Sequence, residues 1–172
     1  MNIFKLTTIW NWIPQRLTVH QPSLLFTTRV NGTSVNTLFG VLNDLEYSLI
    51  IIKTFQNEIF GAFCSGLWEE RKNNKQNYFG NGETFLFSLV PQKNLYRWIG
   101  TKKCKKTTSN QEFFIRVDRN KIVIGGGSQD GLAINSNLTE GTTNRCDTFD
   151  NEPLCSMSNF QIDILEVIGF GN

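Results

Sequence analysis

FGNGETFLFSL, residues Phe79 to Leu89, predicts a tight turn that leads straight into a buried strand. Gly80 and Gly82 let the backbone take a positive φ or run close to another segment, because neither carries a Cβ. Five of the six residues from Phe85 to Val90 are apolar. Successive side chains of a strand point to opposite faces, so both faces of this strand are largely apolar. We therefore expect a strand in the middle of the core, covered on both sides.

The junction between this turn and this strand holds two candidate functional residues, Glu83 and Thr84. A carboxylate and a hydroxyl at such a point could contact a partner or a ligand. They are also common acceptors of hydrogen bonds from backbone N–H groups, which fix a turn. No histidine partner, metal-ligand set or phosphate loop accompanies them in the sequence, so the role in fixing the turn is favoured.

Further strands are predicted on both sides of this stretch by runs of alternating or β-branched apolar residues. They are expected at residues 23–30, 47–54, 58–65, 95–99, 112–118, 121–124, 132–135 and 160–170. Gly61, inside one of them, predicts a bulge or a close approach of another segment. The segment 139–158 is expected to be irregular, with anchors at Cys146, Phe149, Pro153 and Leu154.

Helical periodicity is clearest at residues 34–45, where apolar side chains make one face and Ser34 can cap the start. That face consists of Val35, Leu38, Phe39, Leu42 and Leu45. Residues 7–17 carry a second apolar pattern, but Pro14 interrupts it, so two short turns are expected there. Residues 66–78 are expected to form a solvated loop or short helix anchored by Trp68.

These elements together predict a mainly β fold of the α+β class, a sandwich of two antiparallel β-sheets with a few flanking helices. The 172 residues suffice for one domain with a core. We expect residues 1–22 to be a lead-in of helical turns that packs on a domain spanning 23–170. A net charge of +2 is too small to indicate a nucleic-acid partner. No apolar run reaches the length of a membrane span, and no signal peptide is recognisable, so a cytoplasmic location is expected.

Four cysteines and one histidine limit the chemistry that the chain can support. Cys64, Cys104, Cys146 and Cys155 form no CxxC pair, and with His20 they match no common zinc spacing. No metal or other cofactor is therefore expected. Reduced thiols in or near the core are the favoured interpretation. A disulfide between Cys146 and Cys155 is an open alternative.

The run Arg145-Cys146-Asp147-Thr148 is the second candidate site. A Cys146 thiolate could react with peroxide if Arg145 lowered its pKa. The alternative is a packed structural thiol, and the plain interpretation of Asp147 is a loop carboxylate that accepts backbone N–H bonds. A further hypothesis combines Glu83, Asp147 and Cys146 in an enzyme or small-ligand site, although the sequence does not bring them together.

Two other patterns favour ordinary structural roles. The lysines Lys102, Lys103, Lys105 and Lys106 could contact an anionic lipid surface or an acidic protein, but a solvated hairpin loop is the simpler interpretation. Gly125-Gly126-Gly127 lacks the spacing of a phosphate-binding loop, and the segment after it resembles a strand, so a turn is expected.

Six motifs in order give the chain a family resemblance: IKTFQNEIFGAFCS, YFGNGETFLFSL, YRWIG, IVIGGG with GLAI, CDTFDNEPL and ILEVIGF. The sequence from about Ser23 to Phe170 resembles a TLDc domain. Together with the lead-in WNWIPQRLTVHQPSLLFTT, it is most similar to the Skywalker type, in which a Rab-GAP-like TBC domain precedes the TLDc domain. No TBC domain is present in this sequence, so an excised C-terminal domain or a short product is expected.

The resemblance implies a sandwich of two antiparallel sheets and a protein-interaction module without an enzymatic reaction of its own. It also implies roles in oxidative-stress resistance and in synaptic vesicle traffic. The partners it implies are subunits of the vacuolar proton pump and an N-terminal TBC domain, with contact to vesicle membranes that is at most peripheral. Where many relatives have two asparagines and two prolines, this chain has Asp150-Asn151-Glu152-Pro153.

Overall fold

The computed structural model describes residues 3–73, 77–100 and 112–170. Every pair of neighbouring strands among these residues is antiparallel. They are β1 (Pro22–Thr27), β2 (Tyr47–Thr54), β3 (Ile59–Ser65), β4 (Phe85–Val90), β5 (Asn94–Arg97), β6 (Ile115–Asp118), β7 (Lys121–Ile124), β8 (Leu132–Ile134), β9 (Glu140–Thr143) and β10 (Asn159–Phe170). The helices are α1 (Ile3–Trp10), α2 (Thr28–Asn31) and α3 (Val35–Leu42), with the 3-10 turns η1 (Gln15–Leu17) and η2 (Trp68–Lys72).

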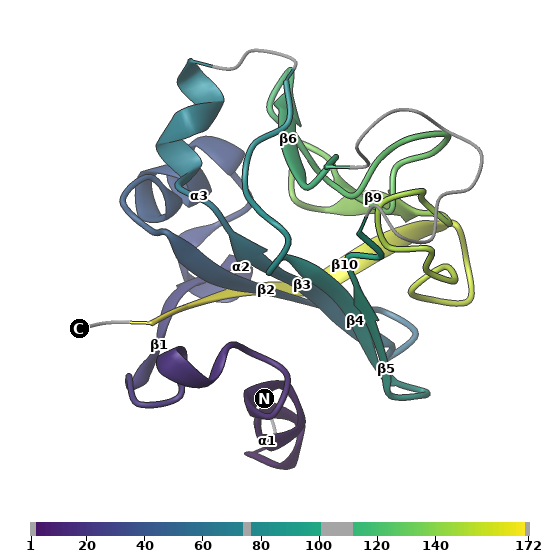
Figure 1. The fold of residues 1–172 in the computed structure, drawn as a ribbon, viewed down its shortest axis with the longest axis horizontal. Coiled ribbons are helices and arrows are strands. Elements are labelled where there is room, and N and C mark those ends of the chain that lie inside the picture. Colours follow the sequence, from purple (N-terminus) through teal and green to yellow (C-terminus); the bar gives the residue numbers. More distant parts are fainter. Residues whose placement is uncertain (1–2, 74–76, 101–111, 171–172) are drawn as a thin grey trace.

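The long strand β10 joins two halves of one antiparallel sheet. The strand order is β5-β4-β3-β2-β10-β9-β8-β7-β6, and β1 also pairs with β10. The first residues of β10 pair with β9, while its later residues lie between β1 and β2. In Figure 1, β6 and β9 lie on one side of β2, β3 and β4, and α1 lies on the other. The expected mainly β fold with few helices is confirmed, with the two sheets connected through β10.

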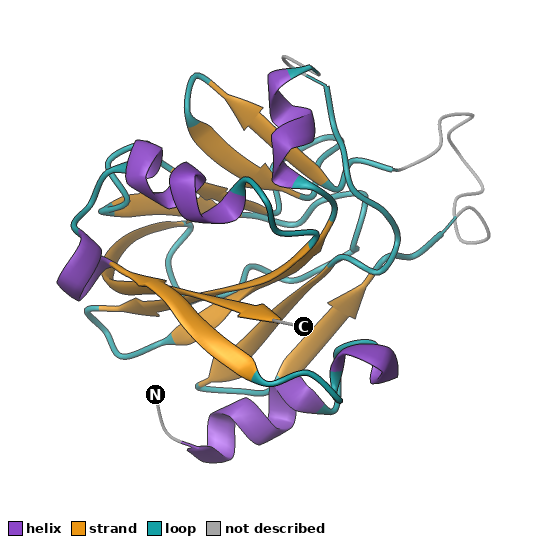
Figure 2. Cartoon of the chain, turned by 90° about the vertical axis from the view of Figure 1, so that its left-hand side faces the viewer, coloured by secondary structure: helices purple, strands orange, loops and turns teal. Residues whose placement is uncertain are grey.

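Two apolar cores result from this layering. The larger core lies between the two halves and α3, and it includes Ile50, Phe60, Leu86, Ile122 and Ile134. The smaller core lies on the opposite face of β2, β3 and β4, under the N-terminal segment. Figure 2 shows the helices arranged around the outside of the strands. The central strands are therefore buried on both faces, as their uninterrupted apolar runs predict.

Strand β4 has the two faces that its sequence predicts. Leu86 packs in the larger core, whereas Phe85, Phe87 and Leu89 pack in the smaller one. Phe85, Leu86 and Phe87 are fully buried. Together with β2 and β3, the strand therefore separates the two cores.

The lead-in segment covers the outer face of these strands. Ile9, Ile13 and Leu17 are buried in the smaller core. The ring centroid of Trp12 lies 6.3 Å from that of Phe87. The break expected at Pro14 is found between α1 and η1, although α1 begins at Ile3, before the expected position. Residues 6–17 are thus a packed layer of the fold.

Several element boundaries differ from the expectation. The strand expected to reach residue 30 ends at Thr27 and turns into α2, where the Asn31 Oδ1 accepts a hydrogen bond from the Thr27 N at 2.9 Å. Ser34 precedes α3 but makes no side-chain capping bond, and α3 ends at Leu42. The strand expected at 112–118 begins only at Ile115.

The region 139–158 contains a strand that was not expected, β9. Its sequence, Glu-Gly-Thr-Thr, has no apolar alternation, but it pairs with β8 on one side and with β10 on the other. Cys146, Phe149 and Leu154 are buried anchors as expected. Pro153 is exposed, so the prediction that it anchors the segment is wrong. No helix in the described part of the chain is both long and apolar enough to cross a membrane.

Candidate functional site

Close backbone approaches shape the turn that precedes β4. Gly80 has a φ of +89°, and a Cβ added to Gly66 would lie 2.6 Å from the Gly80 Cα. A Cβ on Gly82 would lie 2.3 Å from the ring of Trp98. Only glycine leaves room for these contacts. The glycines therefore place the next two residues, Glu83 and Thr84, against the end of β3.

Thr84 ties the turn to β3 from inside the protein. Its side chain is fully buried, and its Oγ1 accepts a hydrogen bond from the Ser65 N at 3.1 Å. The Thr84 N donates to the Asn81 O at 3.1 Å, and the Glu83 N donates to the Asn81 Oδ1 at 3.0 Å. These bonds satisfy the polar groups of the turn, so Thr84 has the structural role that the sequence favours.

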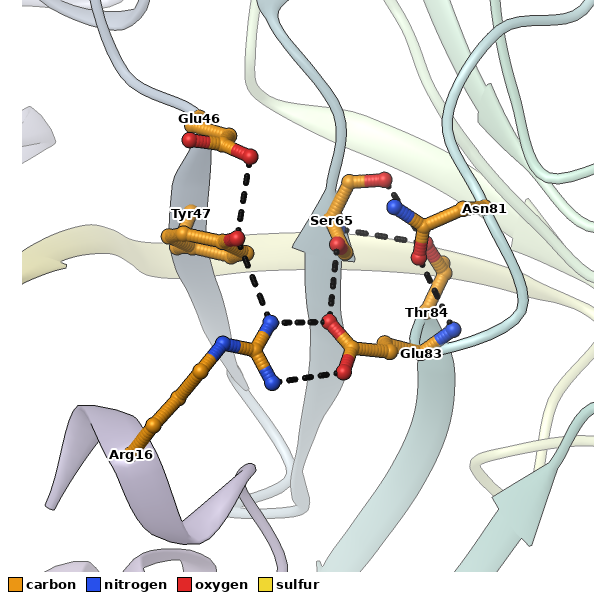
Figure 3. Close-up of polar contacts among 7 residues, drawn as sticks. All are labelled: Arg16, Glu46, Tyr47, Ser65, Asn81, Glu83 and Thr84. Carbon is orange, nitrogen blue, oxygen red and sulfur yellow. Dashed lines mark hydrogen bonds and ion pairs between the residues drawn. The ribbon is translucent and has the colours of Figure 1, made fainter.

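Glu83 forms a two-point ion pair with Arg16 of the lead-in segment (Figure 3). The Arg16 Nη1 lies 2.7 Å from the Glu83 Oε1, and the Arg16 Nη2 donates to the Oε2. The Ser65 hydroxyl also donates to Oε2, at 3.4 Å. The hydrogen bonds from Arg16 hold the pKa of Glu83 below its ordinary value. Glu83 therefore remains an ionised acceptor rather than a proton donor near neutral pH.

The same guanidinium connects Glu83 to a second carboxylate. The Arg16 Nη2 donates to the Tyr47 hydroxyl oxygen at 3.2 Å, and this hydroxyl donates to the Glu46 Oε1 at 2.9 Å. The Arg16 Cζ also lies 5.3 Å from the centre of the Tyr47 ring. A cavity of about 350 Å³ opens beside this chain of contacts, lined by Glu46, Gly66, Leu67, Glu70, Gly80 and Asn81.

Cys146 is packed in the larger core and bonded to an amide. It is 1% exposed, and its Sγ and backbone N lie 3.1 and 3.2 Å from the Asn151 Oδ1. Burial raises the pKa of the thiol to about 11. Arg145 does not activate it, because its guanidinium pairs with Asp150, with the Nε 2.9 Å from the Asp150 Oδ1. The thiol is thus protonated and shielded.

Asp147 and Thr148 fix the glycine turn at residues 125–127. The Asp147 carboxylate accepts hydrogen bonds from the Ser128 N and the Ser128 hydroxyl, at 2.9 and 3.1 Å. The Thr148 Oγ1 accepts a hydrogen bond from the Gly126 N at 3.2 Å. This turn closes onto the loop 146–148, in agreement with the structural role expected of the three glycines.

The structure divides the candidate residues into two sets with different partners. Glu83 and Thr84 bond to Arg16 and Ser65, whereas residues 145–148 bond to residues 126–128, 150 and 151. Glu83, Asp147 and Cys146 share no hydrogen-bond partner within the described residues. The four lysines at 102, 103, 105 and 106 lie outside the described residues.

Arg16 and Asn151 are the functional-site neighbours that sequence reasoning missed. Asn151 Nδ2 donates to the Asn144 O and the Glu152 O, both at 2.9 Å, so one buried amide organises the whole loop. The position of Asn151 within the motif CDTFDNEPL could have marked it as a residue with a role in this loop. Arg16 stands 67 positions before Glu83, and its only signal was a charge beside the apolar residues of the lead-in.

The connected antiparallel sheets, with few helices around them, define a mainly β module. The chain belongs to the TLDc domain family, whose model matches residues 1–171. The resemblance read from the six motifs is thereby confirmed.

The relatives include longer proteins of three kinds. The GTPase-activating protein skywalker of Drosophila melanogaster is 44% identical over 170 residues, which cover 96% of this chain and 29% of that protein. TBC1 domain family member 24 of Xenopus laevis is 33% identical, with 99% and 37% covered. Oxidation resistance protein 1 of Bos taurus is 31% identical, with 98% and 18% covered. The chain therefore spans less than two fifths of the length of each of these relatives.

Proposed function

We propose that this protein is a non-enzymatic TLDc interaction module of a vesicle-trafficking, Rab-GAP-associated protein that contributes to oxidative-stress resistance. Its partners are subunits of the vacuolar proton pump and a TBC domain, and it acts in the cytoplasm at the periphery of vesicle membranes, including those of synapses. The observation that carries this proposal is the match to skywalker over 96% of the chain. The name of oxidation resistance protein 1, a relative over 98% of the chain, supports the link to oxidative stress.

The state of the thiols favours a binding role over a chemical one. Cys64, Cys146 and Cys155 are free and buried, and burial raises the pKa of each thiol. A protonated, shielded thiol is a poor nucleophile toward peroxide. Resistance to oxidation would then come from a partner that the module engages rather than from reaction at these three sulfurs.

Retention of the pump's soluble peripheral sector tests the proposed partner. The purified protein is immobilised, and the purified sector is passed over it at physiological salt. We expect the sector to be retained and to be eluted by free TLDc protein. A sector that passes through unretained would contradict this partnership.

A cell experiment tests the role in oxidative stress. Survival in peroxide of cells that lack oxidation resistance protein 1 should improve when this chain is expressed, and unchanged survival would contradict that role.

A further inference from the structure

Two large apolar side chains are exposed to solvent at one end of the molecule. Phe55, in the turn between β2 and β3, is 62% exposed, and Met157, in the segment before β10, is 57% exposed. Gln56 and Met157 line the same cavity, so the turn and the segment form one surface. Figure 1 shows the start of β10 and the end of β2 on the same side of the fold. We name the surface formed by residues 54–58, residues 152–161 and Glu140 the turn face.

Two cavities flank the exposed side chains of the turn face. The first, of about 460 Å³, is lined by residues that include Gln56, Glu140, Met157 and Phe160. The second, of about 300 Å³, is lined by residues that include Glu58, Glu152 and Ser156. Exposed apolar side chains beside cavities with both polar and apolar lining offer a partner's side chains both burial and hydrogen bonds.

The turn face is also fixed in shape by the core beneath it. Both carboxylate oxygens of Glu58 lie 3.2 Å from the Ser156 N, which clamps the turn to the segment before β10. Phe160 is 4% exposed and meets Phe60 edge to face, with ring centroids 4.9 Å apart. A surface that is already ordered loses less conformational entropy when it binds.

The charge of this surface is opposite in sign to that of the whole chain. Glu58, Glu140 and Glu152 line the cavities, and the described residues that line them include no lysine, arginine or histidine. The whole chain, in contrast, has a net charge of +2. Amide and hydroxyl groups supply the remaining polar lining. Carboxylate and amide oxygens are acceptors that complement the N–H groups of lysine and arginine.

We propose that the turn face docks a protein segment in which apolar side chains alternate with lysine or arginine. Phe55 and Met157 would contact the apolar side chains, while Glu58, Glu140 and Glu152 receive the cations. An anionic lipid surface or a nucleic acid would be repelled by these carboxylates. This inference rests on the proposed function as an interaction module and gives that module its contact surface.

A peptide titration tests the turn face without any pump subunit. The probe is a short soluble peptide of leucine, serine and lysine, and its counterpart carries glutamate in place of every lysine. Amide shifts of the ¹⁵N-labelled protein are followed at two salt concentrations. We expect the lysine peptide to shift residues 54–58 and 152–161, more strongly at low salt, and the glutamate peptide to leave them unchanged. Equal shifts with both peptides, or shifts confined to other surfaces, would overturn the proposal.

Two exposed pairs provide matched variants for this titration. Phe55→Ser with Met157→Ser should weaken binding of the lysine peptide about tenfold, as loss of central apolar contacts does. Val19→Ser with Val30→Ser removes two side chains that are 82% and 81% exposed elsewhere, and binding should not change. Equal affinities of the two double variants would overturn the turn face, even if the pump sector is retained. Failure of pump retention alone would remove that partner and leave the peptide result intact.

Discussion

The ion pair between Arg16 and Glu83 shows how one side chain can fasten two distant parts of the fold. Arg16 belongs to the lead-in segment, and Glu83 belongs to the glycine turn before β4. Both side chains are partly exposed, so the pair contributes modestly to stability. Its larger effect is to fix where the lead-in segment lies on the sheet.

Replacing Arg16 with Gln should raise the pKa of Glu83 toward its ordinary value of 4.5. A carboxylate whose pKa is lowered by folding stabilises the protein above the unfolded-state value, and this stabilisation is lost as the pH falls through the folded-state value. The variant should therefore lose less stability below pH 4.5 than the wild type does. Titration of the Glu83 side-chain carboxyl by ¹³C NMR measures the shift directly.

Arg29→Gln is the control for this titration, because Arg29 pairs with Asp163 and not with Glu83. It should leave the Glu83 titration where it is in the wild type. A Glu83 pKa that is the same in the wild type and in Arg16→Gln would show that the ion pair does not hold in solution.

Cys146 should resist mild oxidation in the folded protein. Burial raises the pKa of its thiol to about 11, so the thiolate fraction at neutral pH is very small. A sulfenic-acid probe with residue-resolved mass spectrometry should therefore find Cys146 unlabelled under mild peroxide and labelled once the protein is unfolded. Selective labelling in the folded state would contradict the structural role of this thiol and revive the redox hypothesis.

Some of the residue roles in the candidate site could be predicted from the sequence. The role of Thr84 in fixing a turn follows from its place between two glycines and a strand. The Glu83 carboxylate, expected to accept backbone N–H bonds, accepts hydrogen bonds from Arg16 and the Ser65 hydroxyl instead. Arg16 could not be predicted, because its contact with Glu83 depends on how the lead-in segment packs. Asn151 likewise acquires its role only when the loop 144–152 closes around its amide.

At the scale of elements, strand β4 bears on both cores, so its side chains should be costly to shorten. Phe87→Ala should reduce the free energy of unfolding by about 3–5 kcal/mol, because it leaves a cavity under the lead-in segment. Phe55→Ala, at an exposed position, should change it by no more than about 0.5 kcal/mol. Urea denaturation of the two variants measures both values. A loss below about 1 kcal/mol for Phe87→Ala would contradict the position of β4.

Two glycines in regular elements should respond in opposite directions to alanine. A Cβ at Gly61 in β3 would lie 1.9 Å from the backbone O of Ile50, so Gly61→Ala must disrupt the pairing of β2 and β3. Gly40 in α3 has no neighbouring atom within 4 Å of an added Cβ, so Gly40→Ala should stabilise by about 0.5–1 kcal/mol. Thermal unfolding of the pair checks this. Equal melting temperatures would contradict the register of β2 and β3.

Local pattern predicted those elements whose apolar residues follow one period. The ranges of β2, β4 and β10 were found almost to the residue, because each has a continuous or alternating apolar run. Strand β9 was missed because its residues form a strand only between β8 and β10. The end of β1 was missed for a similar reason, since the Thr27 N donates a hydrogen bond to the Asn31 side chain and so starts α2.

At the scale of the whole molecule, two connected sheets and a packed lead-in segment leave one end with exposed apolar side chains and acidic cavities. The mainly β class and the family could be read from strand periodicity and from the order of six motifs. The connection of the two halves through β10 could not, because pairing partners far apart in sequence leave no local pattern. The acidic turn face could not be predicted for the same reason, because its carboxylates come from separate segments at residues 58, 140 and 152.

Hydrogen–deuterium exchange of the protein, alone and with the purified peripheral sector of the vacuolar pump, tests the central claim most directly. An interaction module that uses the turn face should become protected at residues 54–58 and 152–161 when the sector is added. The exchange of β1 and α3 should remain as in the free protein. Unchanged exchange throughout the chain would contradict the claim that this protein binds the pump, and protection confined to other segments would contradict the surface assigned to that binding.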